Sequence, residues 1–138
     1  MSLGINTIQK LVAEAAKVLA PAGFDVEIVE KHHNQKLDVP SGTAILLADS
    51  IKSVKEDCEY NIGRHESGKR KKNEIGIHAI RMGNIVGEHE VIIGTDTQTI
   101  TLKHEAHTRA LFAEGAIAAA DFLVGKPAGL YAMKDIVK

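Results

Sequence analysis

Residues 30–44 read EKHHNQKLDVPSGTA and join a predicted strand to a predicted helix. Before this stretch, residues 24–29 alternate apolar and acidic side chains, which is typical of a strand with one solvent-facing side. After it, apolar residues recur at helical spacing over residues 41–55. Pro40 disfavours helical geometry at the residue before it, so we expect the helix to begin at Ser41. The stretch therefore places two adjacent histidines at the end of a strand, shortly before a Ser-Gly-Thr helix start.

The rest of the chain predicts two more helices and three consecutive strands. The helices are expected over residues 6–20 and 108–124, and the strands over residues 75–82, 86–95 and 98–105. This order indicates an α/β chain of the α+β type, with an open mixed sheet of about four strands and the three late strands forming a meander. We expect residues 56–73 to be irregular. Helices are expected to cover one sheet face, and the other face is predicted to serve oligomerisation.

Length and composition are those of one soluble globular domain over residues 1–138, with 44% hydrophobic and 25% charged residues. Seventeen basic and eighteen acidic residues leave a net charge of −1, so no general attraction to nucleic acid or to a membrane is expected. The single cysteine, Cys58, cannot form an internal disulfide, which fits either a reducing cytoplasm or indifference to the compartment; we expect a cytoplasmic location. Neither G-x-G-x-x-G nor G-x-x-x-x-G-K-[ST] occurs, so we predict no cofactor-binding residues in this chain.

Ser41, Gly42 and Thr43 form the first candidate site, an anion cradle at a helix start. The first backbone N–H groups of a helix have no partner within the helix, and Gly42 has no side chain to hold a ligand away from them. The helix dipole favours a bound anion there by roughly 0.3–1 kcal/mol. The hydroxyl groups of Ser41 and Thr43 add two donors. The alternative is that Ser41 only caps its own helix.

Charged and titratable side chains precede this cradle. Histidine exchanges a proton near neutral pH, so the pair His32 and His33 offers a proton donor, whereas an idle surface pair is the alternative. Lys36 can hold a second anionic group. Asp38 is expected either to orient Lys36 or His33 or to start the turn before Pro40. Arg109 is predicted near the start of the last helix, where it either faces the anion cradle or is an ordinary surface arginine.

The five other histidines lack the spacing of metal ligands relative to cysteine or carboxylate, so we predict no metal site. The basic run over residues 69–72 is interpreted as a solvated loop, because a site for single-stranded nucleic acid would also need aromatic side chains.

Four segments resemble the C-terminal domain of the dihydrodipicolinate reductases, also called 4-hydroxy-tetrahydrodipicolinate reductases. The first is E-x-HHxxK-x-D-x-PSGTA over residues 30–44; the others are IRMGNIVGEHEV over 80–91, LKHEAHTRALFAEGA over 102–116, and the ending GLYAMKDIV. The resemblance covers essentially the whole chain. It implies a substrate-binding and tetramerisation domain that forms a homotetramer, with the N-terminal Rossmann nucleotide-binding domain absent from this chain.

The resemblance also implies a reaction: an oxidoreductase step in lysine and diaminopimelate biosynthesis, in which NADPH or NADH reduces a cyclic unsaturated imine dicarboxylate. By matching position, His32 is the proton donor and Lys36 its catalytic partner, while the substrate carboxylates are held by His33, Ser41, Gly42 and Thr43. Arg109 matches a motif position without an assigned role. Because no cofactor is expected on this domain, the isolated chain is predicted to be inactive. Two alternatives stay open: a non-catalytic dicarboxylate-binding module, or an oligomerisation module in which the histidine loop is idle.

Overall fold

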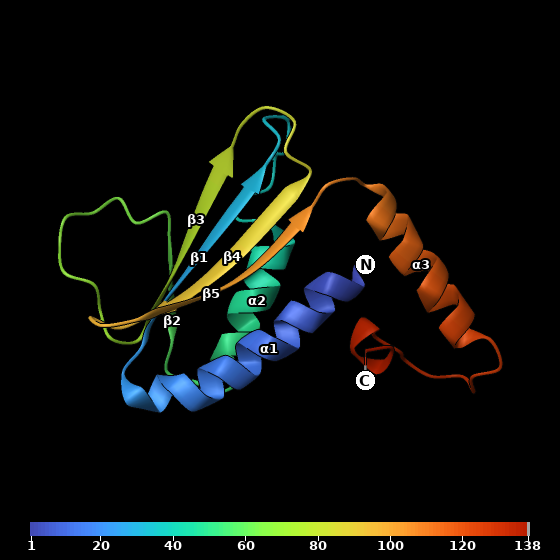
Figure 1. The fold of residues 1–138 in the computed structure, drawn as a ribbon, viewed down its shortest axis with the longest axis horizontal. Coiled ribbons are helices and arrows are strands. Elements are labelled where there is room, and N and C mark those ends of the chain that lie inside the picture. Colours follow the sequence, from blue (N-terminus) through green and yellow to red (C-terminus); the bar gives the residue numbers. More distant parts are fainter. Residues whose placement is uncertain (138) are drawn as a thin grey trace.

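The computed structural model describes residues 1–137 and contains a five-stranded mixed sheet with strand order β2-β3-β1-β4-β5 (Figure 1). Strands β2, β3 and β1 run parallel, and β4 and β5 are antiparallel to their neighbours. The helices are α1 (Leu3–Leu19), α2 (Gly42–Lys52) and α3 (Ala110–Leu123). The strands are β1 (Asp25–His32), β2 (Glu59–Ile62), β3 (Glu74–Arg81), β4 (Gly87–Gly94) and β5 (Thr99–Ala106). Single 3-10 turns follow α1 and precede the C-terminus, at Ala20–Ala22 and Met133–Asp135.

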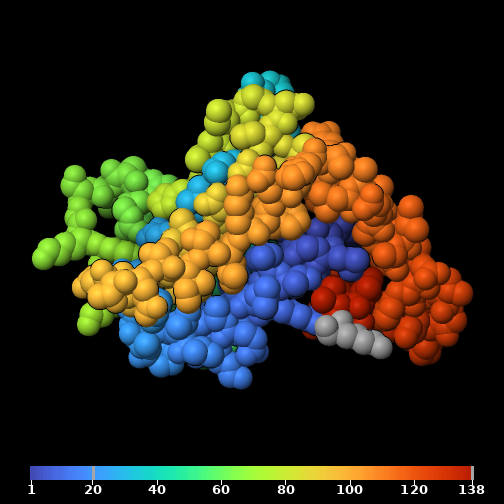
Figure 2. All heavy atoms as spheres, viewed as in Figure 1, coloured from blue at the N-terminus to red at the C-terminus, as the bar shows by residue number. Residues whose placement is uncertain are grey.

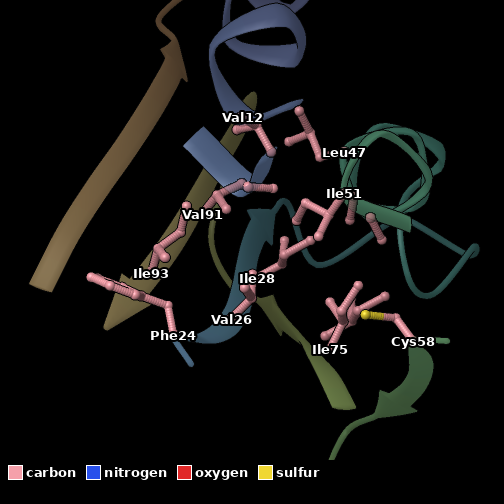
Figure 3. Close-up of a cluster of buried hydrophobic side chains, with 14 residues drawn as sticks. Val12, Phe24, Val26, Ile28, Leu47, Ile51, Cys58, Ile75, Val91 and Ile93 are labelled. Carbon is pink, nitrogen blue, oxygen red and sulfur yellow. The ribbon is translucent and has the colours of Figure 1, made fainter. Parts of the chain in front are cut away.

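Helices α1 and α2 pack on one face of this sheet and enclose an aliphatic core (Figures 1 and 3). Alternate residues of β1 point into that core, and Val26 and Ile28 are buried there with Val91 and Ile93 of β4. Leu47 is fully buried on the facing side of α2. The predicted α+β class, with an open mixed sheet and helices on one face, is confirmed.

The predicted meander is wrong, because β1 lies between β3 and β4. The connection from Arg81 to Gly87 does not form a hairpin; it crosses the end of β1, where Met82 N–H donates to the His32 carbonyl oxygen at 3.0 Å. A further bond runs from Asn34 N–H to the Gly83 oxygen at 3.2 Å. Two strand spacings are only about 10 Å, a gap that five connecting residues span easily. Strand β1 is therefore the central strand, and its buried face joins the buried faces of β3 and β4.

Strand β2 lies within residues 56–73, where the sequence predicted irregular structure. Its four residues show no clear alternation of buried and exposed side chains, since Glu59 and Ile62 are both exposed, so no apolar face marks this segment as a strand. Pairing with β3 creates it, through the register Tyr60↔Ile75 and Ile62↔Ile77. The sheet thus has five strands where about four were predicted.

Helix α3 extends away from the sheet, and Figure 2 shows α3 and the C-terminal tail beside the start of α1. Gly115 is its only buried residue, and it packs directly against the backbone of Met1. Apolar residues on the same helix stay in solvent; Ile117 is 70% exposed and Leu123 is 47% exposed. Over residues 1–137, no helix combines the length and apolar character needed to cross a membrane.

Candidate active site

The C-terminal end of β1 carries a glutamate and a histidine on its buried side. The alternation that buries Val26 and Ile28 continues through Glu30 and His32, which are 0% and 8% exposed. Such side chains are seldom buried without partners, because removing a charge from water is costly. The site must therefore supply donors for the Glu30 carboxylate.

Four N–H groups surround that carboxylate. Arg81 at the end of β3 donates from both terminal nitrogens, each at 2.7 Å, in a bidentate pair. The Ser41 amide donates to Oε1 at 2.9 Å, and His32 Nδ1 lies 2.6 Å from Oε2. Burial by itself raises the pKa of Glu30, but the donors from Arg81, His32 and Ser41 outweigh it and hold the pKa below the ordinary value. Glu30 is therefore a carboxylate at neutral pH.

This carboxylate determines which nitrogen of His32 is free. An ionised carboxyl group only accepts hydrogen bonds, so Nδ1 must carry a proton toward Glu30. Nε2 is then the nitrogen that can exchange a proton with a ligand. Gly87 of β4 lies on that side, since a Cβ atom added there would be 3.1 Å from Nε2. The arrangement suits general acid catalysis at Nε2.

Helix α2 begins next to this histidine. Ser41 is the N-cap, and its Oγ accepts a hydrogen bond from Ala44 N–H at 3.2 Å, so the capping role is confirmed. The same oxygen lies 2.9 Å from His89 Nε2. Gly42 is exposed, and a Cβ atom there would meet nothing within 4 Å. Thr43 is half-buried in the first turn. The N-terminus of α2 therefore faces open space, as an anion cradle requires.

The loop between β1 and α2 carries the remaining candidates. Lys36 Nζ pairs with Asp38 Oδ1 at 2.7 Å, and this hydrogen bond lowers the pKa of Asp38. Of the roles considered for Asp38, the structure thus supports orienting Lys36. His33 Nε2 lies 3.3 Å from a terminal nitrogen of Arg109, 76 residues away along the chain. Arg109 is exposed at the start of α3, but on the side that reaches the histidine pair.

The chain is similar to proteins of one known family. The family model described as "Dihydrodipicolinate reductase, C-terminus" matches residues 4–137. The chain belongs to this family. It is 56% identical over 140 residues to the 4-hydroxy-tetrahydrodipicolinate reductase of Caldanaerobacter subterraneus subsp. tengcongensis, with 100% of this chain and 55% of the relative covered. The protein of the same name from Methanosarcina mazei is 46% identical over 136 residues, with 99% of this chain and 51% of the relative covered.

A solved structure agrees with this assignment. The dipicolinate-bound dihydrodipicolinate reductase from Paenisporosarcina sp. TG-14 superposes with a TM-score of 0.76 at 27% identity, covering 98% of this chain and 51% of that one. The resemblance read from the motifs is therefore confirmed. The chain spans about half the length of the dihydrodipicolinate reductases it matches.

Glu30 and three further residues around the site were not identified as site residues from the sequence. Arg81 and His89 arrive on other strands, and Gly87 makes room for the histidine ring. His89 is 4% exposed, and burial, followed by the nearby charge of His32, lowers its pKa to about 4. Its ring meets that of His32 edge to face at 5.1 Å. Arg81, Gly87 and His89 all lie in the motif IRMGNIVGEHEV. Their positions in the alternation of buried and exposed residues along β3 and β4 were the signal that could have identified them.

The chain contains no glycine-rich loop of the kind that holds the phosphates of a nicotinamide cofactor in a Rossmann domain. Within residues 1–137, no three side chains of His, Cys, Asp or Glu are grouped so that they could hold a metal ion. The described side chains at the site offer donors to an anion and a histidine that can exchange a proton.

Proposed function

We propose that this chain is the substrate-binding and catalytic-acid domain of an NAD(P)H-dependent dihydrodipicolinate reductase in lysine and diaminopimelate biosynthesis. The buried Glu30–His32 pair beside the N-terminus of α2 carries the proposal, because it combines a directed proton donor with an anion site. Membership of the family supplies the reaction class. The hydride comes from the cofactor, which a separate nucleotide-binding domain would hold.

A dicarboxylate would meet two positive regions. One carboxylate binds the free amides of α2 at Gly42 and Thr43, with the hydroxyls of Ser41 and Thr43 as further donors. The other binds Lys36, with His33 and Arg109 at the mouth of the site. The dipicolinate bound to the Paenisporosarcina reductase is such a dicarboxylate. This arrangement would hold the ring of the substrate beside His32 Nε2. The donor would be the doubly protonated imidazolium, which gives up the proton on Nε2 and keeps the one on Nδ1.

Two unpartnered surfaces support a larger assembly. Helix α3 exposes Phe112, Ile117 and Leu123, and a cavity of about 430 Å³ lies between α3 and the starts of α1 and α2. The part of the longer relatives that this chain does not span is our candidate cover for it. The sheet face opposite α1 and α2 has no helix on it, and we assign it to contacts between copies in a homotetramer.

Calorimetric titration of the chain with dipicolinate tests the binding part of this proposal. We expect saturable binding of one dipicolinate per chain. Lys36→Ala should weaken it by about 10- to 100-fold, since a hydrogen bond to a charged group contributes about 1.5–3 kcal/mol. Lys17→Ala, an exposed lysine in the last turn of α1, is the matched control and should bind as the unmodified chain does.

The enzymatic part needs a nucleotide-binding domain. The chain alone is expected to show no reductase activity. Fusing the N-terminal remainder of the Caldanaerobacter relative ahead of residue 1 should produce NAD(P)H-dependent turnover. Binding without turnover in this fusion would favour the non-catalytic dicarboxylate module, and a stable tetramer without dipicolinate binding would favour the oligomerisation module.

Gly87 provides a test of the space around His32. A methyl group at this position would lie 3.1 Å from His32 Nε2, and the ring cannot easily withdraw because Glu30 holds Nδ1 at 2.6 Å. Gly87→Ala should therefore lower turnover of the fusion by about tenfold, since small displacements of a catalytic group are costly. Gly94→Ala on the same strand is the control, because its methyl group would meet the exposed Thr99 hydroxyl at 3.3 Å. Equal turnover of the two variants would show that Nε2 is not the reacting nitrogen.

A further inference from the structure

The Glu30–Arg81 ion pair contacts each of the three segments that form the site. Its carboxylate accepts from His32 Nδ1 at the end of β1 and from the Ser41 amide at the start of α2. Its guanidinium donates to the Asp38 carbonyl oxygen at 2.9 Å, in the loop that carries Lys36. One ion pair thus joins the proton donor, the anion cradle and the lysine loop.

Glu30 is ionised because its donors lower its pKa, and three of the four nitrogens around it can only donate. Its two oxygens face four nitrogens: two of Arg81, the amide of Ser41 and Nδ1 of His32. The arginine and amide groups can only donate, so each oxygen must accept. A glutamine would place an NH₂ group against at least one of these donors. The orientation that best relieves this conflict points the NH₂ group at His32 Nδ1, which must then lose its proton to accept.

The buried ion pair between Glu30 and Arg81 is not explained by its contribution to stability alone. Buried ion pairs often stabilise no better than apolar residues of similar size. Arg81 Nε is buried without a hydrogen-bond partner among residues 1–137, so the guanidinium is not fully satisfied. Its two terminal nitrogens donate to the Glu30 carboxylate, which holds His32, and to the carbonyl oxygens of Asp38 and Ile80.

These contacts lead us to infer that Glu30 and Arg81 are the positioning residues of the site. Glu30 keeps the proton of neutral His32 on Nδ1 and so directs Nε2 to the ligand, while Arg81 fixes the Lys36 loop relative to that ring. The inference deepens the proposed function and rests on it for its meaning in catalysis, but the tautomer of His32 can be measured without any ligand.

The same strand provides a matched control. Glu27 of β1 also binds arginine and histidine, through Arg64 at 2.8 Å, Arg70 at 3.0 Å and His78 at 2.8 Å. It lies on the opposite sheet face, among odd-numbered residues that point away from α1 and α2, and its side chain is 27% exposed whereas that of Glu30 is fully buried. Glu27→Gln therefore makes the same chemical change in a similar cluster without touching His32.

The test is long-range ¹H–¹⁵N NMR of the histidine rings in this chain, at alkaline pH where the rings are neutral. We expect His32 to carry its proton on Nδ1 in the unmodified chain and in Glu27→Gln, and on Nε2 in Glu30→Gln. Arg81→Lys should keep the Nδ1 tautomer, because the carboxylate remains, but should weaken dipicolinate binding about tenfold by releasing the loop. Glu30→Gln leaves the buried Arg81 charge without its carboxylate partner and could fail to fold for that reason. The double variant Glu30→Gln with Arg81→Gln removes this charge and should show the same Nε2 tautomer of His32.

The outcomes separate this inference from the proposed function. A His32 ring that keeps Nδ1–H in Glu30→Gln, or in the double variant, overturns the positioning role of Glu30. Unchanged dipicolinate affinity in Arg81→Lys overturns that of Arg81. If the unmodified chain shows the Nδ1 tautomer and Glu30→Gln changes it, but dipicolinate does not bind the unmodified chain, the role of Glu30 stands and the proposed function fails.

Discussion

Replacing His32 with Gln is expected to lower kcat of the fusion by about 10²- to 10⁴-fold, the range typical for loss of a general acid. Dipicolinate affinity should change by less than about tenfold, because the N-terminus of α2 and Lys36 hold the carboxylates. The expectation depends on the 2.6 Å contact between Nδ1 and Glu30, which makes Nε2 the exchangeable position. Steady-state kinetics and calorimetry on the same variant separate the two effects.

His65→Gln is the control for this change, since His65 is exposed in the loop before β3, far along the chain from residues 30–44. Its kcat should equal that of the unmodified fusion. A His32→Gln enzyme with kcat within about threefold of the unmodified one would show that the proton comes from another group or from water. Equal losses in kcat and in dipicolinate affinity would instead make His32 a binding residue.

Much of this site was predictable because it is local in sequence. His32, Lys36 and Ser41 lie within ten residues, and a strand end, a turn before Pro40 and a helix start place them together without knowledge of the rest of the fold. Hydrophobic periodicity likewise predicted the three helices and four of the strands to within a few residues. The roles of the predicted site residues stay proposals until the experiments above are done.

The remaining part of the site depends on strand order, which periodicity does not encode. Arg81 meets His32 because β3 pairs in parallel with β1, with the register His32↔Arg81. His89 of β4 lies opposite Glu30 of β1, because the two strands pair in the register Glu30↔His89. The expected meander would have paired β3 with β4, so that β1 could not lie between them. Glu30 was not predicted to be buried, because the expected strand ended at residue 29, whereas the alternation of Val26 and Ile28 continues through Glu30 in the structure.

His89 makes the second large prediction, on stability against pH. Burial, with a smaller contribution from the charge of His32, lowers its pKa to about 4, whereas in the unfolded chain it takes up a proton near its ordinary value of 6.5. Between these values the unfolded state binds more protons, so stability falls as pH falls. The loss approaches about 1.4 kcal/mol per pH unit, or about 3 kcal/mol between pH 7 and 4. Urea unfolding at several pH values and one protein concentration measures it.

His89→Gln should reduce this slope, because the side chain no longer titrates and its amide can still form a hydrogen bond with Ser41 Oγ. The remaining slope in this range would come from His104, whose pKa burial also lowers. His107→Gln is the matched control; His107 is exposed after β5, and the variant should keep the full slope. The lowered pKa of Glu30 also costs stability in acid, but its loss begins only near the ordinary carboxyl value of 4.5 and extends below it. A decline confined to pH below about 4.5 would therefore assign the acid sensitivity to the carboxyl groups whose pKa is lowered, Glu30 among them, and contradict the role given to His89.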